Sequence, residues 1–292
     1  MYKKFLMITA LMLAGAMQAT PWFTQDRWGY KFFGYVKHES FWDTRQIVGG
    51  NDDQNLLYPE NRLLDPQGND INAHGEYNTS VLETRMGFAV DGPPVGQAKS
   101  IALIEWDLIG RSITEPLDVF ALRHAYVQIE WECFKLIAGQ TWHPLALPMT
   151  DTISFNQGNP ISAYGRSPQV FLSYKLGSFE FWGAALSQID FTSDGPQGES
   201  SEYLRNAVMP NLDFQVHYHI DEANEIGVMV DIKRLVPRLE TLTGYKAYES
   251  IMSYSADAFV MLHWPRWFLI SEVTFASNLL ERALAIILVE MS

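Results

Sequence analysis

The sequence is poor in cysteine and in positive charge, and each shortage excludes a class of protein. Only one of its 292 residues, Cys133, is a cysteine, so no disulfide can form within the chain and a disulfide-stapled secreted fold is excluded. The 34 acidic side chains outnumber the 21 basic ones, which gives a formal net charge of -13. Because binding to phosphates needs a basic surface, this balance argues against nucleic acid as a partner.

Long apolar runs are missing beyond the N-terminus, although 47% of the residues are hydrophobic. At the N-terminus, Lys3 and Lys4 precede an apolar stretch at 5–17, and the small residue Ala19 follows. This order is typical of a secretory signal peptide. We expect residues 1–19 to be cleaved and the mature chain to leave the cytoplasm. An N-terminal membrane anchor is the alternative, and the shortness of the apolar stretch disfavours it.

The stretch NLDFQVHYHI at 211–220 alternates apolar and polar residues with the period of a β-strand. Side chains on a strand point to alternate faces. One face would carry Leu212, Phe214, Val216, Tyr218 and Ile220, and the other Asp213, Gln215, His217 and His219. The pattern therefore predicts one apolar and one polar face, and it raises two readings of the polar one: a metal site or the wall of a pore.

Similar alternation predicts about eleven strands in all, and no segment shows helical periodicity. The other segments are residues 30–46, 77–90, 98–110, 119–131, 133–142, 166–176, 179–190, 224–235, 249–263 and 266–277. Short turns alternate with longer polar connections between these segments. The short ones are 91–97, 131–133, 176–178, 221–224 and 264–266, and the long ones are 47–76, 111–118, 143–165, 191–208 and 234–248. This order is typical of an outer-membrane β-barrel.

The bilayer determines which face of each strand points to lipid and which points to the lumen. Hydrocarbon offers no hydrogen-bond partner, so strands can span it only as a closed barrel whose apolar side chains face lipid and whose polar ones face a wet lumen. We therefore expect His217 and His219 to line an aqueous channel. A metal site that also uses Asp213 remains the alternative, but no third ligand follows at a fixed spacing.

Several stretches resemble the DcaP-like family of outer-membrane porins, over about residues 30 to 279. They are FFGYVKHESFWDTRQIV at 32–48, LETRMGFAVDGPPVGQAKSIALIEWDLIG at 82–110, LRHAYVQIEWECFKLIAGQTWHPL at 122–145, GRSPQVFLSYK at 165–175 and ISEVTFASNL at 270–279. The resemblance implies an all-β fold, a transmembrane antiparallel β-barrel of sixteen strands. It also implies a homotrimer in the bacterial outer membrane that passes small, mostly anionic, hydrophilic solutes. It implies no cofactor and no catalytic or metal-binding residue.

Charged and polar residues on the predicted inner face are the candidates for lining the pore. Residues 143–165 form the third external loop, and by analogy with general porins this loop folds inward and narrows the channel. The candidates are Arg85, Glu105, Asp107, His124, Lys135, Asp151, Asn156, Arg166, Asp213, His217 and His219. Opposed acidic and basic walls would orient dipolar solutes, whereas a ring of one sign would select by charge.

Arg123 does not fit this pattern. By parity with Val127 and Ile129 it is expected on the outward face. A cation there would cost roughly 2–4 kcal/mol at the bilayer midplane. We therefore expect Arg123 to lie near an interface or under a neighbouring subunit. Tryptophans near strand ends are expected either in interfacial girdles or in ordinary packing, and these are Trp131, Trp142, Trp264 and Trp267.

The C-terminal residues depart from the family pattern. The stretch LLERALAIILVEMS at 279–292 reads as an amphipathic helix as readily as a strand, and it lacks a terminal aromatic residue. We therefore divide the chain into a signal peptide at 1–19, a porin-like barrel domain at 20–279 and an atypical tail at 280–292. On this view about 11–12 of sixteen strands are present and the barrel is incomplete. The alternative is that 279–290 provides a twelfth strand that closes a smaller barrel.

Two other functions stay open besides a passive diffusion channel. The chain contains no P-loop, Rossmann glycine pattern, G-x-S-x-G elbow or H-E-x-x-H motif, so no sequence motif supports an enzyme. An outer-membrane β-barrel enzyme would have to use a serine such as Ser187 or Ser271 with His217. A soluble metal-binding β-barrel would use Asp213, His217 and His219.

Overall fold

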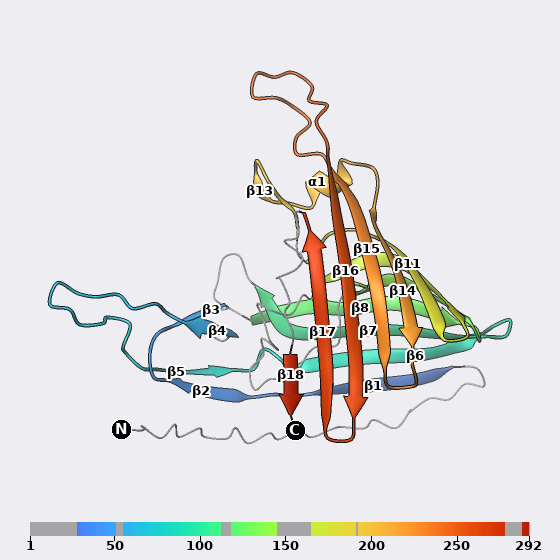
Figure 1. Ribbon diagram of the computed structural model, residues 1–292, viewed down its shortest axis with the longest axis horizontal. Helices are drawn as coiled ribbons and strands as arrows, with labels where there is room; N and C mark the ends of the chain where they lie inside the picture. The colour runs from blue at the N-terminus through green and yellow to red at the C-terminus, as the bar shows by residue number, and fades with distance from the viewer. Residues whose placement is uncertain are drawn as a thin grey trace.

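The structure is a computed structural model that describes residues 28–50, 55–111, 118–144, 165–190, 192–277 and 288–291. The predicted signal peptide at 1–19 lies outside these ranges. The described chain is dominated by β-strands, with one short helix, α1 (Glu202–Arg205) (Figure 1). Within the described ranges, no helix combines the length and the apolar character needed to cross a membrane.

Twelve strands form one antiparallel sheet in which neighbours in sequence are neighbours in space. In order across the sheet they are β1 (Gly29–Tyr35), β6 (Arg85–Val95), β7 (Ala98–Arg111), β8 (Asp118–Glu130), β9 (Phe134–Trp142), β10 (Arg166–Leu176), β11 (Phe179–Leu186), β14 (Asn211–His219), β15 (Glu225–Leu235), β16 (Ile251–Trp264), β17 (Trp267–Ala276) and β18 (Leu288–Met291). The predicted all-β antiparallel fold is confirmed, because every pair of neighbouring strands in this sheet is antiparallel.

Tight turns join the strands where turn residues cluster in the sequence. Between β14 and β15, the Asp221 carboxylate accepts hydrogen bonds from the backbone N–H groups of Ala223 (2.8 Å) and Asn224 (2.9 Å). The side-chain amide of Asn224 and the backbone N–H of Ala223 also hold the pKa of Asp221 below its ordinary value. Asp and Asn form such turns because their short side chains can bond the backbone two or three residues on.

The predictions of single strands at 30–46 and 77–90 are wrong, because each segment is divided in two. The ladder between β1 and β6 stops at Tyr35 and Arg85. Just beyond it, the Thr84 hydroxyl accepts from the backbone N–H of Lys37 (3.2 Å) and donates to the carbonyl of the same residue (3.3 Å), so a side chain replaces the ladder there. The chain then forms a separate hairpin.

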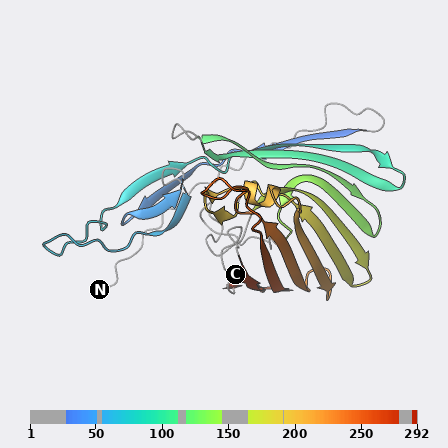
Figure 2. The ribbon, with the colours of Figure 1, turned by 90° about the horizontal axis from the view of Figure 1, so that it is seen from above.

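This second unit, residues 39–80, is called the arm. Its strands are β2 (Glu39–Asp43), which pairs with β5 (Glu76–Ser80), and β3 (Ile47–Gly50), which pairs with β4 (Asn55–Pro59). Figure 2 shows the arm extending away from the main sheet. The long connection at 191–208 likewise contains a short hairpin, β12 (Asp194–Gly195) with β13 (Gly198–Glu199), followed by α1.

The main sheet curls upon itself, so that β6 and β7 lie across from β14 to β17 (Figure 2). In the described residues β1 pairs with β6 alone and β18 with β17 alone, so the curl is open between β1 and β18. Residues 288–291 of the predicted tail thus form a strand and not a helix. They supply a twelfth strand, but within the described ranges that strand does not close a smaller barrel.

The distribution of residues over the two faces is the reverse of that in a soluble protein. Along β14 the exposed fractions alternate: Asp213 is 0% exposed, Phe214 52%, Gln215 3%, Val216 36% and His217 4%. The same holds along the neighbouring strands. Exposed apolar residues on the convex face include Val170, Leu172, Tyr174, Phe181, Val228, Val230, Tyr254, Val273 and Phe275, and buried polar ones on the concave face include Gln169, Ser173, Asn211, Asp231, Lys233, Ser253, Ser255 and Asp257.

Glycines make room for aromatic rings on the concave face. A Cβ added at Gly227 would lie 2.3 Å from the Phe259 ring, and one added at Gly87 would lie 2.3 Å from the Phe33 ring. Each glycine is directly opposite its aromatic partner on the neighbouring strand. Such pairs let a large ring lie flat on the curled sheet, where a side chain on both strands would not fit.

The exposed apolar face gives a test of whether it meets lipid. Val230 lies at the middle of β15 and points outward, so Val230→Arg should lower the free energy of unfolding in lipid vesicles by about 2–4 kcal/mol. Leu242 in the 236–250 connection is 99% exposed, so Leu242→Arg should be nearly neutral and is the matched control. Unfolding can be followed by tryptophan fluorescence. Equal, small effects of the two substitutions would contradict a lipid-facing β15.

Candidate functional site

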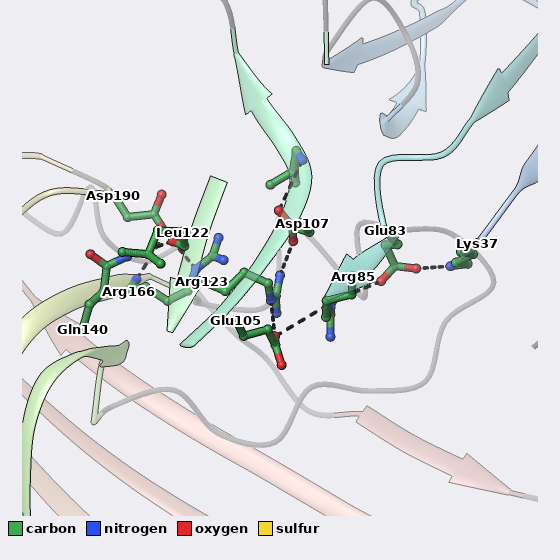
Figure 3. Close-up of polar contacts among 11 residues, drawn as sticks. Lys37, Glu83, Arg85, Glu105, Asp107, Leu122, Arg123, Gln140, Arg166 and Asp190 are labelled. Atoms are coloured by element: carbon green, nitrogen blue, oxygen red, sulfur yellow. Dashed lines mark hydrogen bonds and ion pairs between the residues drawn. The ribbon is translucent and has the colours of Figure 1, made fainter. Parts of the chain in front are cut away.

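A network of alternating charges occupies the concave face of β6, β7 and β8 (Figure 3). Arg123 makes two short ion pairs, Nε with Glu105 Oε1 at 2.7 Å and Nη1 with Asp107 Oδ2 at 2.6 Å. Arg85 Nε lies 3.8 Å from the same oxygen of Glu105. Asp107 is 0% exposed and Arg123 is 6% exposed. Buried charges are tolerated only when they are paired in this way.

The network continues past the end of the ladder between β1 and β6. Arg85 Nη2 lies 3.8 Å from Glu83 Oε1, and the other oxygen of Glu83 pairs with Lys37. Lys37 also contacts Glu39 at 3.0 Å. Burial acts to lower the pKa of Lys37, but the bonds to Glu83 and Glu39 outweigh it and hold that pKa above its ordinary value. Lys37 is therefore charged at neutral pH.

The expectation that Arg123 faces outward is wrong, and a β-bulge is the reason. In the ladder between β7 and β8, Glu105 is opposite His124, whereas the next residue, Trp106, is opposite Leu122. The extra residue in β8 is Arg123. A bulge of this kind shifts the alternation by one position, so parity counted from Val127 fails beyond it. Arg123 thus joins the interior network, and its position no longer argues for a neighbouring subunit.

Trp142 at the end of β9 lies close to two guanidinium groups. Cζ of Arg123 is 5.4 Å and Cζ of Arg166 is 5.2 Å from the centre of its ring, within the range of cation–π attraction. The His124 ring meets the same indole edge-on at 5.5 Å, and its Nδ1 lies 3.1 Å from the Thr141 hydroxyl. Trp142 is therefore half-buried among charged groups.

Arg166 has one nitrogen without a hydrogen-bond partner in the part of the chain that the structure describes. Its Nε and backbone N–H both approach Asp190 Oδ2, at 3.3 Å and 3.2 Å. Arg166 is only 6% exposed, and none of the described residues gives its buried Nη1 a hydrogen-bond partner. A buried guanidinium donor of this kind is one that a carboxylate or phosphate oxygen can satisfy.

The other three tryptophans near strand ends are more exposed. Trp264 and Trp267 flank the turn between β16 and β17, where their rings stack at 3.7 Å. Trp131 follows β8, and the centre of its ring lies 5.5 Å from the centre of the Phe134 ring. All three are between 36% and 41% exposed, at the end of the sheet where the tight turns lie. This placement suits an interfacial girdle.

The concave face of β14, β15 and β16 carries buried carboxylates. Asp213 is directly opposite Asp231, and Asp257 lies on the next strand. Asn211 Nδ2 donates to Asp231 at 2.8 Å, and Gln215 Nε2 donates to Asp213 at 2.9 Å. Asp257 accepts from the Thr274 hydroxyl. This wall lies across the curl from β6, β7 and β8 (Figure 2).

His217 and His219 both lie on this concave wall and both contact Glu225. His217 is 4% exposed, its ring stacks 4.0 Å from that of Trp182, and its Nε2 lies 2.8 Å from Gln215 Oε1. His219 contacts Glu225 through Nδ1 at 3.1 Å. Among the described residues, no group of three or more His, Cys, Asp or Glu side chains is arranged to hold a metal ion.

Neither candidate serine is placed beside His217. The Ser187 hydroxyl donates to the Pro168 carbonyl at 3.3 Å. Ser271 precedes Glu272, which is opposite the inward-facing Phe259, so Ser271 belongs to the convex face. The ring nitrogens of His217 face Gln215 and Glu225 instead. The described structure thus offers no support for a serine–histidine pair.

Two loop candidates, Asp151 and Asn156, lie outside the described residues. The start of the same loop is described, and it brings in a residue that sequence reasoning missed. His143 is buried, with Nε2 3.4 Å from Asn211 Nδ2 and 3.9 Å from Asp231 Oδ2. Its position next to GQTW was a signal that could have found it. Lys135, a predicted candidate, lies with Nζ 5.6 Å from the centre of the Phe171 ring.

The sequence matches no family model and no curated protein. The fold is similar to that of the outer membrane channel DcaP of Acinetobacter baumannii, with a TM-score of 0.64 over 88% of this chain and 66% of that one, at 17% identity. It is also similar to the outer-membrane expressed OmpT of Vibrio cholerae, with a TM-score of 0.51 over 92% and 67% of the chains, at 9% identity. The predicted resemblance to DcaP is thus confirmed at the level of the fold, and the chain spans about two thirds of that channel's length.

The buried network around Arg123 predicts a large effect of removing its charge. Arg123→Met leaves Glu105 and Asp107 without their closest cation, so we expect the free energy of unfolding in detergent micelles to fall by about 3–5 kcal/mol. The control is Arg205→Met in α1, whose pair with Glu202 is mostly exposed. It should cost less than about 1 kcal/mol. Similar losses for the two variants would show that the Arg123 network is not tightly buried.

Proposed function

We propose that this protein is a porin of the bacterial outer membrane, through which small, hydrophilic, anionic solutes diffuse passively. The observation that carries the proposal is the reversed distribution of side chains, with apolar residues on the convex face and charged ones on the concave face. A soluble protein would bury the apolar face. The similarity of the fold to that of an outer membrane channel supports the same reading.

The arrangement of interior charges supports a preference for anions. Arg85 and Arg123 lie on one wall, and Arg166 at the start of β10 meets the same indole as Arg123; its Nη1 has no hydrogen-bond partner among the described residues. Asp213, Asp231 and Asp257 lie on the wall across the curl. A field between the guanidinium groups on the first side and the carboxylates across the curl would orient a solute that carries both charge and dipole. Together with these residues, we propose that Glu105, Asp107, His124, Lys135, His217 and His219 line the passage, and that Asp151 and Asn156 narrow it.

The N-terminal residues would direct the chain to the outer membrane. Residues 1–19 would direct export and then be removed, as the order of Lys3, Lys4 and the following apolar stretch indicates.

We also propose a homotrimer, which the resemblance to DcaP-like porins implies. The arm carries exposed aromatic residues, with Trp42 76% and Tyr77 63% exposed, that subunit contacts would cover. Light scattering in detergent would give the mass of three chains, and the mass of one chain would count against the trimer.

Single-channel recording tests the proposed transport. The full-length protein in a planar bilayer should pass ion current, and a gradient of KCl should give a reversal potential of the sign expected for chloride. Hydrolysis of a substrate without any current would instead favour the enzyme, and partition into the soluble periplasmic fraction would favour the soluble barrel.

Arg166 gives a sharper version of this test. Unit charges about 10 Å apart in water interact by about 0.4 kcal/mol, so Arg166→Gln should lower the chloride-to-potassium permeability ratio roughly two-fold at low salt. Arg205→Gln in α1 changes the net charge equally and should leave the ratio unchanged. If the permeability ratio is the same in both variants, Arg166 does not contribute to ion selectivity. That result would not contradict the proposal that the protein is a porin.

A further inference from the structure

His219 bridges two carboxylates that come from the strands on either side of it. Its Nε2 lies 3.2 Å from Glu180 Oε2 on β11, and its Nδ1 lies 3.1 Å from Glu225 Oε2 on β15. Its backbone N–H donates to the Ser178 carbonyl at 2.8 Å, which holds the residue beside the turn between β10 and β11. The three side chains are between 16% and 26% exposed, so they are largely shielded from bulk solvent.

The protonation state of His219 determines whether its ring can pair with both carboxylates. An ionised carboxylate only accepts hydrogen bonds, and a neutral imidazole has a single N–H donor. The Nε2 of His219 is hydrogen-bonded to Glu180, whereas its Nδ1 meets Glu225 as an ion pair, which requires a protonated ring. The geometry points to a charged His219 that acts as a pH-sensitive clasp, joining β11, β14 and β15 in acid and releasing one carboxylate when it loses a proton.

The other charged groups around the clasp determine what happens on deprotonation. On β11, Glu180 also accepts from Trp182 Nε1 at 2.8 Å, and the charge of Lys135 on β9 acts on it. On β15, Glu225 faces His217 Nδ1 as well, at 3.9 Å. On β16, the residue opposite Glu225 is Met261, which carries no charge.

His217 is oriented to share in this change. Gln215 donates its amide N–H to Asp213, so its oxygen faces His217 and accepts from Nε2–H at 2.8 Å. This leaves the Nδ1 of His217 toward Glu225. When His219 is neutral, Glu180 and Glu225 lose the cation that lies between them, and the two carboxylates then repel each other. The clasp should therefore strengthen as pH falls across the range of about pH 5 to 8 in which histidine ordinarily changes charge.

The experiment is urea unfolding of the purified full-length chain in detergent micelles at pH 5.5 and pH 8.0. A hydrogen bond to a charged group should shift the midpoint by about 0.3–0.5 M, upward in acid. His219→Gln removes the ionisable ring and should reduce that pH-dependent shift. His74→Gln is the matched control, because His74 is exposed in the arm, and it should keep the shift of the unchanged protein.

A variant with a permanent charge separates the clasp from simple packing. His219→Lys keeps a cation beside Glu180 and Glu225 at both pH values, so it should be as stable at pH 8.0 as at pH 5.5. Should His219→Gln fail to fold, the nitrogen chemical shifts of the His219 ring in the unchanged protein should show an imidazolium at pH 5.5 and its loss by pH 8.0. Equal midpoint shifts in the unchanged protein and in His219→Gln, or a neutral ring at pH 5.5, would overturn the clasp. The outcome does not depend on ion conduction, so it stands apart from the proposed function.

Discussion

A peptide group in hydrocarbon has no hydrogen-bond partner except another peptide group, and the pairing of the main sheet meets this constraint. Within the main sheet, every strand from β6 to β17 has a paired neighbour on each side, and β12 and β13 form a separate hairpin. Each unpaired N–H or C=O in lipid would cost several kcal/mol, far more than any single side-chain contact contributes. The pairing therefore comes first, and it makes the alternation of side chains between the convex and the concave face possible.

Once the convex face is apolar, the concave face can be polar only if its charges compensate one another. The interior of β6 to β8 meets this condition with Arg123 between Glu105 and Asp107, at distances below 3 Å. Such pairs contribute little net stability compared with apolar residues of the same volume, but losing one partner is costly. This asymmetry explains why the charges on β6 to β8 lie in alternating order.

Much of the fold follows from period-two alternation and the spacing of turn residues. The strands of the main sheet from β7 to β17 lie where the alternation predicts them, because a one-residue slip would turn every apolar side chain of a strand inward. The alternation predicted the wrong face for Arg123, because a bulge adds one residue to β8 without changing the composition of the segment. The break after Tyr35 was also missed, because Thr84 replaces the ladder through a side-chain contact between segments far apart in sequence.

The site was less predictable than the strands. Alternation identifies which residues share a face, so Arg85, Glu105 and Asp107 could be grouped in advance. It does not say which of them meet across strands, and neither the two guanidinium groups over Trp142 nor the two carboxylates on His219 follow from spacing alone. Those contacts depend on how tightly the sheet curls, which is a property of the whole sheet.

The most direct test of the account is spin-label accessibility along residues 211–219, one position at a time in a Cys133→Ser background, with the protein in lipid vesicles. Collisions with oxygen, which concentrates in the bilayer, should peak at 212, 214, 216 and 218 and fall at the positions between them. A profile without this two-residue alternation, or one in which the even positions contact a water-soluble nickel complex instead, would contradict a lipid-facing convex surface.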